Sequence, residues 1–155
     1  MKKLISYRLL AATVALSIPG AALADDNDHH AKGCTTAILN GLYVFAATGY
    51  IIPAAPAPAQ PKAIVELIRF NGDGTLTVPA ATRSLNGAIG QSPPGGTGTY
   101  AIADLVPPDR ACTGTLTFTG GPSFDLFVSP PGDEVWMIQN NPGNVLQGTV
   151  LKLSR

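Results

Sequence analysis

The C-terminal stretch of the chain alternates polar and apolar residues, and this pattern restricts it to extended structure. From Thr113 to Thr119 every second residue is threonine, while Gly114, Leu116 and Phe118 occupy the positions between. Successive side chains of a β-strand point to opposite faces, so the run predicts a strand with one polar and one apolar face. Clusters of Gly, Pro, Asn and Asp close this run and the runs that follow it. The stretch therefore predicts an antiparallel β-meander.

The same signals recur in the preceding residues. The run Asn71-Gly72-Asp73-Gly74 is a hairpin signal, because these residue types tolerate the positive φ of tight turns. A Pro/Ala segment at 51–61 and a Gly/Pro-rich segment at 85–96 are predicted to be loops. The pattern predicts an all-β fold, an eight-stranded antiparallel up-and-down barrel rather than a sandwich. The predicted strands are 41–50, 63–70, 75–83, 97–103, 112–119, 123–129, 134–139 and 145–153.

The first 24 residues have the organisation of a Sec-type signal peptide. A basic start precedes an apolar segment at 9–18, and Ala22-Leu23-Ala24 provides a small-x-small cleavage site. The apolar segment is too short for a permanent membrane span. We therefore expect export to the periplasm or the extracellular medium. The remaining chain divides into a polar tail and lead-in at 25–40 and a single β-barrel domain at 41–155.

The charge of the exported chain argues against nucleic acid as a partner. Cleavage after Ala24 removes three of the ten basic residues and none of the ten acidic ones, which leaves a formal charge of −3. Phosphate binding needs a basic stripe, and this chain lacks one.

The chain has two cysteines, Cys34 and Cys112, and both follow the expected cleavage site. In an oxidising compartment an even count predicts a disulfide, and two cysteines allow one pairing. The bridge would close a loop of 78 residues, to which the chain-entropy model assigns roughly 4 to 5 kcal/mol. The alternative, a reactive thiol pair or a metal site, has no CxxC spacing or adjacent histidines to support it.

No motif in the sequence carries an evident chemistry. Nucleophile elbows, phosphate loops, HExxH helices and CxxC pairs are all missing. His29 and His30 stand beside aspartates in the expected tail, where a solvated segment is favoured over a metal site. We therefore predict no catalytic residue, no metal and no cofactor.

Charged and aromatic residues within the predicted strands are the best candidates for a binding site. Glu66 and Arg69 interrupt a nearly apolar strand, and their odd separation places them on opposite faces. A buried carboxylate would have a raised pKa and could act as a general acid or base, whereas a solvated or ion-paired role is the alternative. An eight-stranded barrel either packs its interior solid or holds one small ligand. Several aromatic residues could point into this interior: Tyr43, Phe45, Tyr100, Phe118 and Trp136.

The order of the motifs resembles that of a known group of proteins. The segments concerned are GLYVFAATG, NGDGTL, GTGTYAI, CTGTLTF, FDLFV, GDEVWMIQ and GNVLQGTVLKLSR, which span nearly all of the chain from Gly41 onward. They resemble small exported bacterial proteins of unassigned function whose fold is similar to the calycin-like allene-oxide-cyclase barrel. The resemblance implies that fold. It carries over no catalytic residue, because none of the cyclases' catalytic residues can be matched here.

Three functions are consistent with these patterns. The leading one is a non-enzymatic barrel that binds a small apolar molecule against the five aromatic residues, with Glu66 or Arg69 orienting a polar end. The alternative is a solid-cored envelope or extracellular interaction module, with a patch built by the loops at 51–61 and 85–96. The third is a cyclase or isomerase, which needs an ionisable group inside a cavity. The sequence leaves the ligand and the oligomeric state undetermined.

Overall fold

The computed structural model describes residues 33–104 and 111–153, which form one β-sheet preceded by a short 3₁₀ helix. The expected signal peptide, the His29-His30 pair and the first part of the polar tail lie outside the described residues. In chain order the elements are η1 (Thr36–Ile38), β1 (Asn40–Ile51), β2 (Gln60–Asn71), β3 (Thr75–Leu85), β4 (Ala88–Ser92), β5 (Gly96–Asp104), β6 (Cys112–Phe118), β7 (Ser123–Ser129), β8 (Glu134–Gln139) and β9 (Asn144–Lys152).

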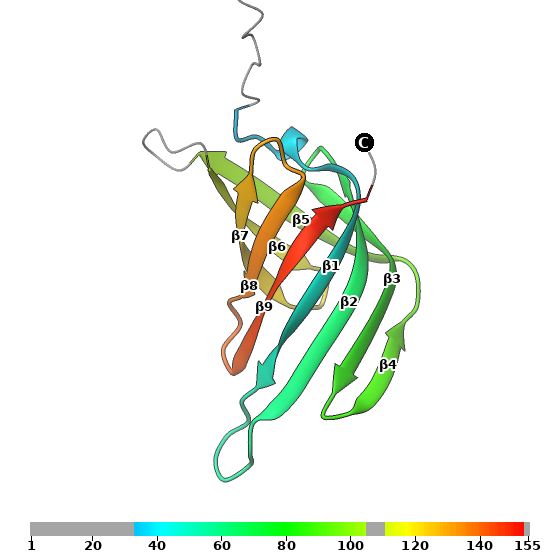
Figure 1. Cartoon of the computed structure of the whole chain (residues 1–155), viewed down its shortest axis with the longest axis vertical. Helices are drawn as coiled ribbons and strands as arrows, with labels where there is room; N and C mark the ends of the chain where they lie inside the picture. The colour runs from blue at the N-terminus through cyan, green and yellow to red at the C-terminus, as the bar shows by residue number, and fades with distance from the viewer. Residues whose placement is uncertain (1–32, 105–110, 154–155) are drawn as a thin grey trace, which may run out of the picture. The chain divides into compact units, whose positions relative to one another are not determined.

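The sheet closes on itself as an antiparallel barrel (Figure 1). Neighbouring strands follow the order β2-β1-β9-β8-β7-β6-β5-β3, and a further pairing between β2 and β3 completes the circle of eight strands. Most strands pair with their neighbours in sequence, so the topology is largely up-and-down. The predicted eight-stranded antiparallel barrel is confirmed. Closure pairs the edge strands that an open sheet would leave exposed.

One strand lies outside the circle of eight. It falls within 85–96, where the sequence predicted a loop, so that prediction is wrong for this strand. Residues Ala88–Ser92 form β4, which pairs with the C-terminal half of β3. The turn between them contains Asn86 at φ 49° and Gly87 at φ 84°, the primed turn that Asn-Gly favours in hairpins. The N-terminal half of β3 pairs with β5 instead. The β3–β4 hairpin therefore extends one wall beyond the circle of the barrel.

The burial of the strands follows the alternation in the sequence. In β6, Cys112 and Leu116 are buried while Thr115 and Thr117 are exposed. The hairpin predicted between 63–70 and 75–83 is present, and it joins β2 to β3. Apolar faces thus meet inside the barrel, where burial of apolar area is the main stabilising contribution.

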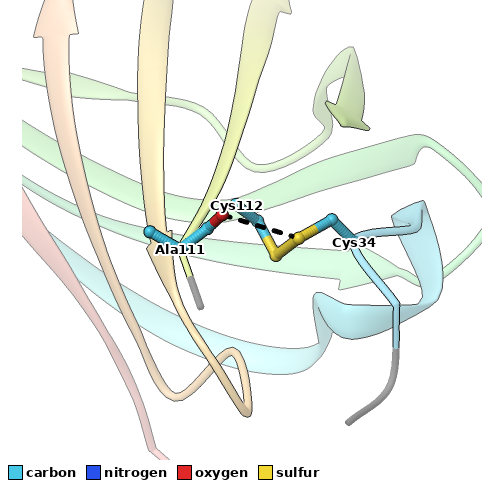
Figure 2. Close-up of a disulfide and its surroundings, with 3 residues drawn as sticks. All are labelled: Cys34, Ala111 and Cys112. Carbon is cyan, nitrogen blue, oxygen red and sulfur yellow. Dashed lines mark hydrogen bonds between the residues drawn. A yellow bond between two sulfur atoms is a disulfide. The ribbon is translucent and has the colours of Figure 1, made fainter. Parts of the chain in front are cut away.

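The chain that precedes β1 fills one end of the barrel. Ile38 and Leu39, at and just after the end of η1, are 3% and 0% exposed. Cys34 and Cys112 form a disulfide that joins this segment to the start of β6 and spans 78 positions, which confirms the predicted bridge (Figure 2). The Cys34 sulfur also lies 3.8 Å from the carbonyl oxygen of Ala111. Residues 33–39 are called the plug below. A disulfide of this kind is typical of an oxidising, extracytoplasmic compartment.

The helices of the described residues include none that is long and apolar enough to cross a membrane.

Candidate functional site

The interior of the barrel is solid at the plugged end, where three aromatic rings stack edge to face. The ring centroids of Tyr43 and Phe70 are 5.1 Å apart, and those of Phe70 and Tyr100 are 5.0 Å apart. The Tyr43 hydroxyl donates a hydrogen bond of 2.8 Å to the carbonyl oxygen of Gly132, and the Tyr100 hydroxyl accepts one of 3.0 Å from the Gly72 N–H. Burial raises the pKa of Tyr43 to about 12 and also raises that of Tyr100. These two predicted ligand residues therefore lie within the packed core.

The opposite end of the barrel contains a cavity of about 230 Å³. Its apolar wall includes Phe45, Phe118 and Phe124, whose rings pack edge to face with centroids 5.8 Å (Phe45–Phe124) and 6.0 Å (Phe118–Phe124) apart. Ile64 and Leu146 also line it. The structure thus brings two of the predicted aromatic residues, Phe45 and Phe118, to one opening. This space is called the mouth cavity below.

Glu66 lies on the wall of the mouth cavity, and its side chain is 7% exposed. Its Oε1 atom is buried and has no hydrogen-bond partner among the described residues. Burial raises the pKa of the Glu66 carboxyl from 4.5 to about 7, because the ionised form is poorly solvated there. Both protonation states are therefore populated near neutral pH. A buried carboxyl without a partner is costly, so one that faces a cavity is a candidate for ligand contact.

Two cations line the outer part of the same cavity, Lys62 on β2 and Arg83 on β3. Burial and the charge of Arg83 lower the pKa of Lys62. The Arg83 side chain lies over Gly90 of β4, where a Cβ atom would be 3.1 Å from Nε of Arg83. Glycine at position 90 thus leaves room for the guanidinium at the rim. The mouth cavity therefore combines apolar walls, a buried carboxyl and two rim cations.

Besides Tyr43 and Tyr100, two further predicted site residues do not reach this cavity. Arg69 is exposed and points to the opposite face of β2 from Glu66, as the odd spacing predicted. Trp136 is 47% exposed on the outer face of β8, where it pairs across strands with Phe127, itself 52% exposed. Both aromatic residues line a shallow outer hollow together with Val65 of β2. The structure thus separates the predicted site residues into three places: the packed end, the mouth cavity and the outer face.

Lys62 and Arg83 were missed by the sequence reasoning. Lys62 has the same parity as Glu66, so its inward direction could have been counted from β2. The inward direction of Arg83 could not be counted along the strand in this way, because the β2–β3 register shifts between Leu67 and Arg69. Two residues of β3, Val78 and Pro79, there oppose one residue of β2, Ile68, which is a β-bulge that reverses the facing of every later residue of β3.

The ionisable groups that line the mouth cavity among the described residues are one carboxyl and two cations, which suit hydrogen bonding and ionic contact. Within the described ranges, no group of three or more His, Cys, Asp or Glu residues could hold a metal ion. A carboxyl that titrates near neutral pH can donate or accept a proton, and the rim cations can contact an anion.

The fold and this cavity define the class of the chain as a disulfide-linked, closed eight-stranded antiparallel β-barrel with a cavity at one end. Comparison of the chain with protein-family models, with curated proteins and with solved structures found no match.

Proposed function

We propose that the protein is an exported barrel that binds a small, largely apolar molecule in the mouth cavity. The observation that carries the proposal is the partnerless Glu66 carboxyl, which is 93% buried and faces a cavity of about 230 Å³. Phe45 and Phe118 would bury the apolar body of the ligand, and Glu66 would hydrogen-bond its polar end. Tyr43 and Tyr100 would support this wall from the packed end.

The export part of the proposal rests on the N-terminal sequence and on the disulfide. The pattern of the first 24 residues and a formed Cys34–Cys112 bridge both fit passage into an oxidising compartment. Membership of the group that resembles the allene-oxide-cyclase barrel is part of the same proposal, supported by the eight-stranded topology. Amino-terminal sequencing of protein from the periplasm or medium would test the export part of the proposal. The expected first residue of the mature protein is Asp25.

Native mass spectrometry of the protein purified from its own cells tests the binding function. We expect a small molecule that is released on denaturation. The variant Ser92→Trp should reduce this bound mass, because Ser92 is an exposed residue that lines the cavity. The control Ala46→Trp adds the same side chain at the outer hollow and should retain it. Absence of bound mass, together with unchanged amide NMR spectra on addition of apolar probes, would contradict the proposal.

Two other functions each have one observation in their favour. An interaction module is favoured by the outer hollow, where Val65, Phe127 and Trp136 are 56%, 52% and 47% exposed. Its test is whether Trp136→Ser changes the sedimentation of the protein alone or in periplasmic extract. A cyclase or isomerase needs an ionisable group in a cavity, and Glu66 meets that condition. Loss of turnover in Glu66→Gln on an identified substrate would support it.

A further inference from the structure

Among the described residues, the two rim cations of the mouth cavity have no anionic partner for their side chains. Outside the backbone pairing of their strands, the side chain of neither Lys62 nor Arg83 forms a hydrogen bond or an ion pair with another residue of the described part of the chain. Cations at the mouth of a cavity usually have a counter-charge from the protein, from solvent ions or from a ligand. Here Lys62 is partly buried, and Arg83 adds a second positive charge close to it. An anion placed between them would relieve both the desolvation and the repulsion.

The register of the strands places these charges at known levels relative to Glu66. On β2 the inward positions are Lys62, Ile64 and Glu66, and each step between them rises about 7 Å along the strand. Ile64 pairs with Arg83 of β3, and Glu66 pairs with Ala81. Arg83 is therefore one step above Glu66, Lys62 is two steps above it, and apolar side chains line the space between.

We propose that the mouth cavity selects compact organic anions that carry a hydrogen-bonding group at the end opposite the charge. The carboxylate, phosphate or sulfate group lies between Lys62 and Arg83, and the apolar body packs against Phe45 and Phe118. The group at the far end meets the Glu66 carboxyl, whose Oε1 atom then gains a partner. This inference rests on the proposed binding function and adds the chemical class of the ligand.

The size of the cavity sets the scale of this ligand. A volume of about 230 Å³ corresponds to the liquid volume of about eight water molecules. Pockets for drug-sized ligands start at about 300 Å³. A single aromatic ring or a short branched chain with one acidic group therefore fits, whereas a long acyl chain would extend beyond the rim.

Three probes that differ in one group each test the proposal. These are 4-hydroxybenzoate, its uncharged analogue 4-hydroxybenzyl alcohol, and benzoate, which lacks the hydroxyl. Each is titrated at low ionic strength, where charge contacts are least screened, and binding is followed by the amide NMR signals of Ile64 and Ala81. We expect 4-hydroxybenzoate to bind at least roughly tenfold more tightly than the alcohol, since charge-assisted hydrogen bonds are the stronger ones. Benzoate should bind with an intermediate affinity.

Charge-removing variants assign the preference to the rim. Lys62→Met and Arg83→Met keep the aliphatic stem and should each reduce the preference for 4-hydroxybenzoate over the alcohol to less than about threefold. The control Arg69→Met removes the same charge from the exposed outer face and should leave the preference unchanged.

The outcomes separate the two proposals. Equal binding of the acid and the alcohol at Ile64 and Ala81 would overturn the anion preference and leave the binding function standing. A preference that survives both rim substitutions would place the anion elsewhere and would also overturn the inference. If none of the three probes shifts these signals at millimolar concentration, the inference fails, and native mass spectrometry with apolar probes then decides the binding function separately.

Discussion

Replacing Glu66 by glutamine should make the stability of the protein less dependent on pH. The carboxyl is 7% exposed, and burial raises its pKa from 4.5 to about 7. Below about pH 4.5 it is protonated in both the folded and the unfolded chain and contributes no pH dependence. Between that pH and about 7, only the folded chain keeps the proton, so the free energy of unfolding falls as pH rises. Each pKa unit corresponds to about 1.4 kcal/mol, so the wild-type protein loses roughly 3 kcal/mol over this range.

Urea unfolding followed by far-UV circular dichroism measures this loss. Wild type and Glu66→Gln should differ little near pH 4, and the variant should be roughly 3 kcal/mol more stable near pH 8. The cationic side chains of Lys62 and Arg83 also line the cavity. The comparison of the unfolding free energies of the wild type and Glu66→Gln is therefore repeated in protein that carries Arg83→Met. The control Asp125→Asn removes a carboxylate from an exposed position of β7. A wild-type to Glu66→Gln difference that stays constant within about 0.5 kcal/mol across this pH range would show that Glu66 is solvated or paired, and the reasoning would be refuted.

Three further substitutions test the fold. Replacing Cys34 and Cys112 together by serine should lower the free energy of unfolding by several kcal/mol, up to the roughly 4 to 5 kcal/mol of the chain-entropy model; a loss below about 1 kcal/mol would mean that the plug is held by packing alone. Gly148→Ala should destabilise the protein strongly, because a Cβ atom there would overlap a backbone carbonyl of β1. Gly33→Ala is the matched control, because the space around Gly33 is open. Equal thermal unfolding temperatures of the two variants would refute the contact. Tyr43→Phe should cost about 1 to 3 kcal/mol, because it leaves a buried carbonyl without its donor; an unchanged urea midpoint would show that water replaces the hydroxyl.

Local patterns in the sequence were sufficient to predict the eight-stranded circle of the barrel and the disulfide between Cys34 and Cys112. Alternation such as that of Thr113 to Thr119 determines which face of a strand is buried, and turn residues mark where strands end. The disulfide followed from two cysteines and the expected compartment, and Cys34 and Cys112 are bonded. The opposite directions of Glu66 and Arg69 followed from their odd spacing.

Features that depend on pairing between strands were not predictable from local patterns. The bulge in β3 reverses the facing of the residues after it, so Arg83 faces the cavity although regular counting from Val78 would point it outward. The Gly/Pro-rich composition of 85–96 predicts a loop, whereas the structure forms β4 there, and the Asn86-Gly87 turn is the local signal of the hairpin.

The aromatic residues show the same limit at the level of single side chains. Phe45 and Phe118 line the cavity, yet Trp136 lies on the outer face, since the strand parity of β8 buries Val135 and Met137 instead. Composition alone identifies an aromatic residue as a candidate, but only the parity of its own strand decides whether it faces in.

One edge of β3 is shared by two strands, β5 along its N-terminal half and β4 along its C-terminal half, whereas its other edge pairs with β2. β4 is hydrogen-bonded to β3 alone in the described residues, whereas each strand of the circle has a neighbour on both sides. A strand held on one side loses its amide protection through a smaller opening event than one held on both sides. Amide protons of Ala88–Ser92 should therefore exchange with solvent faster than those of β9. Ser92 and Pro93 border the cavity, so faster exchange in β4 than in β9 would mark the rim as the part of the barrel that opens first.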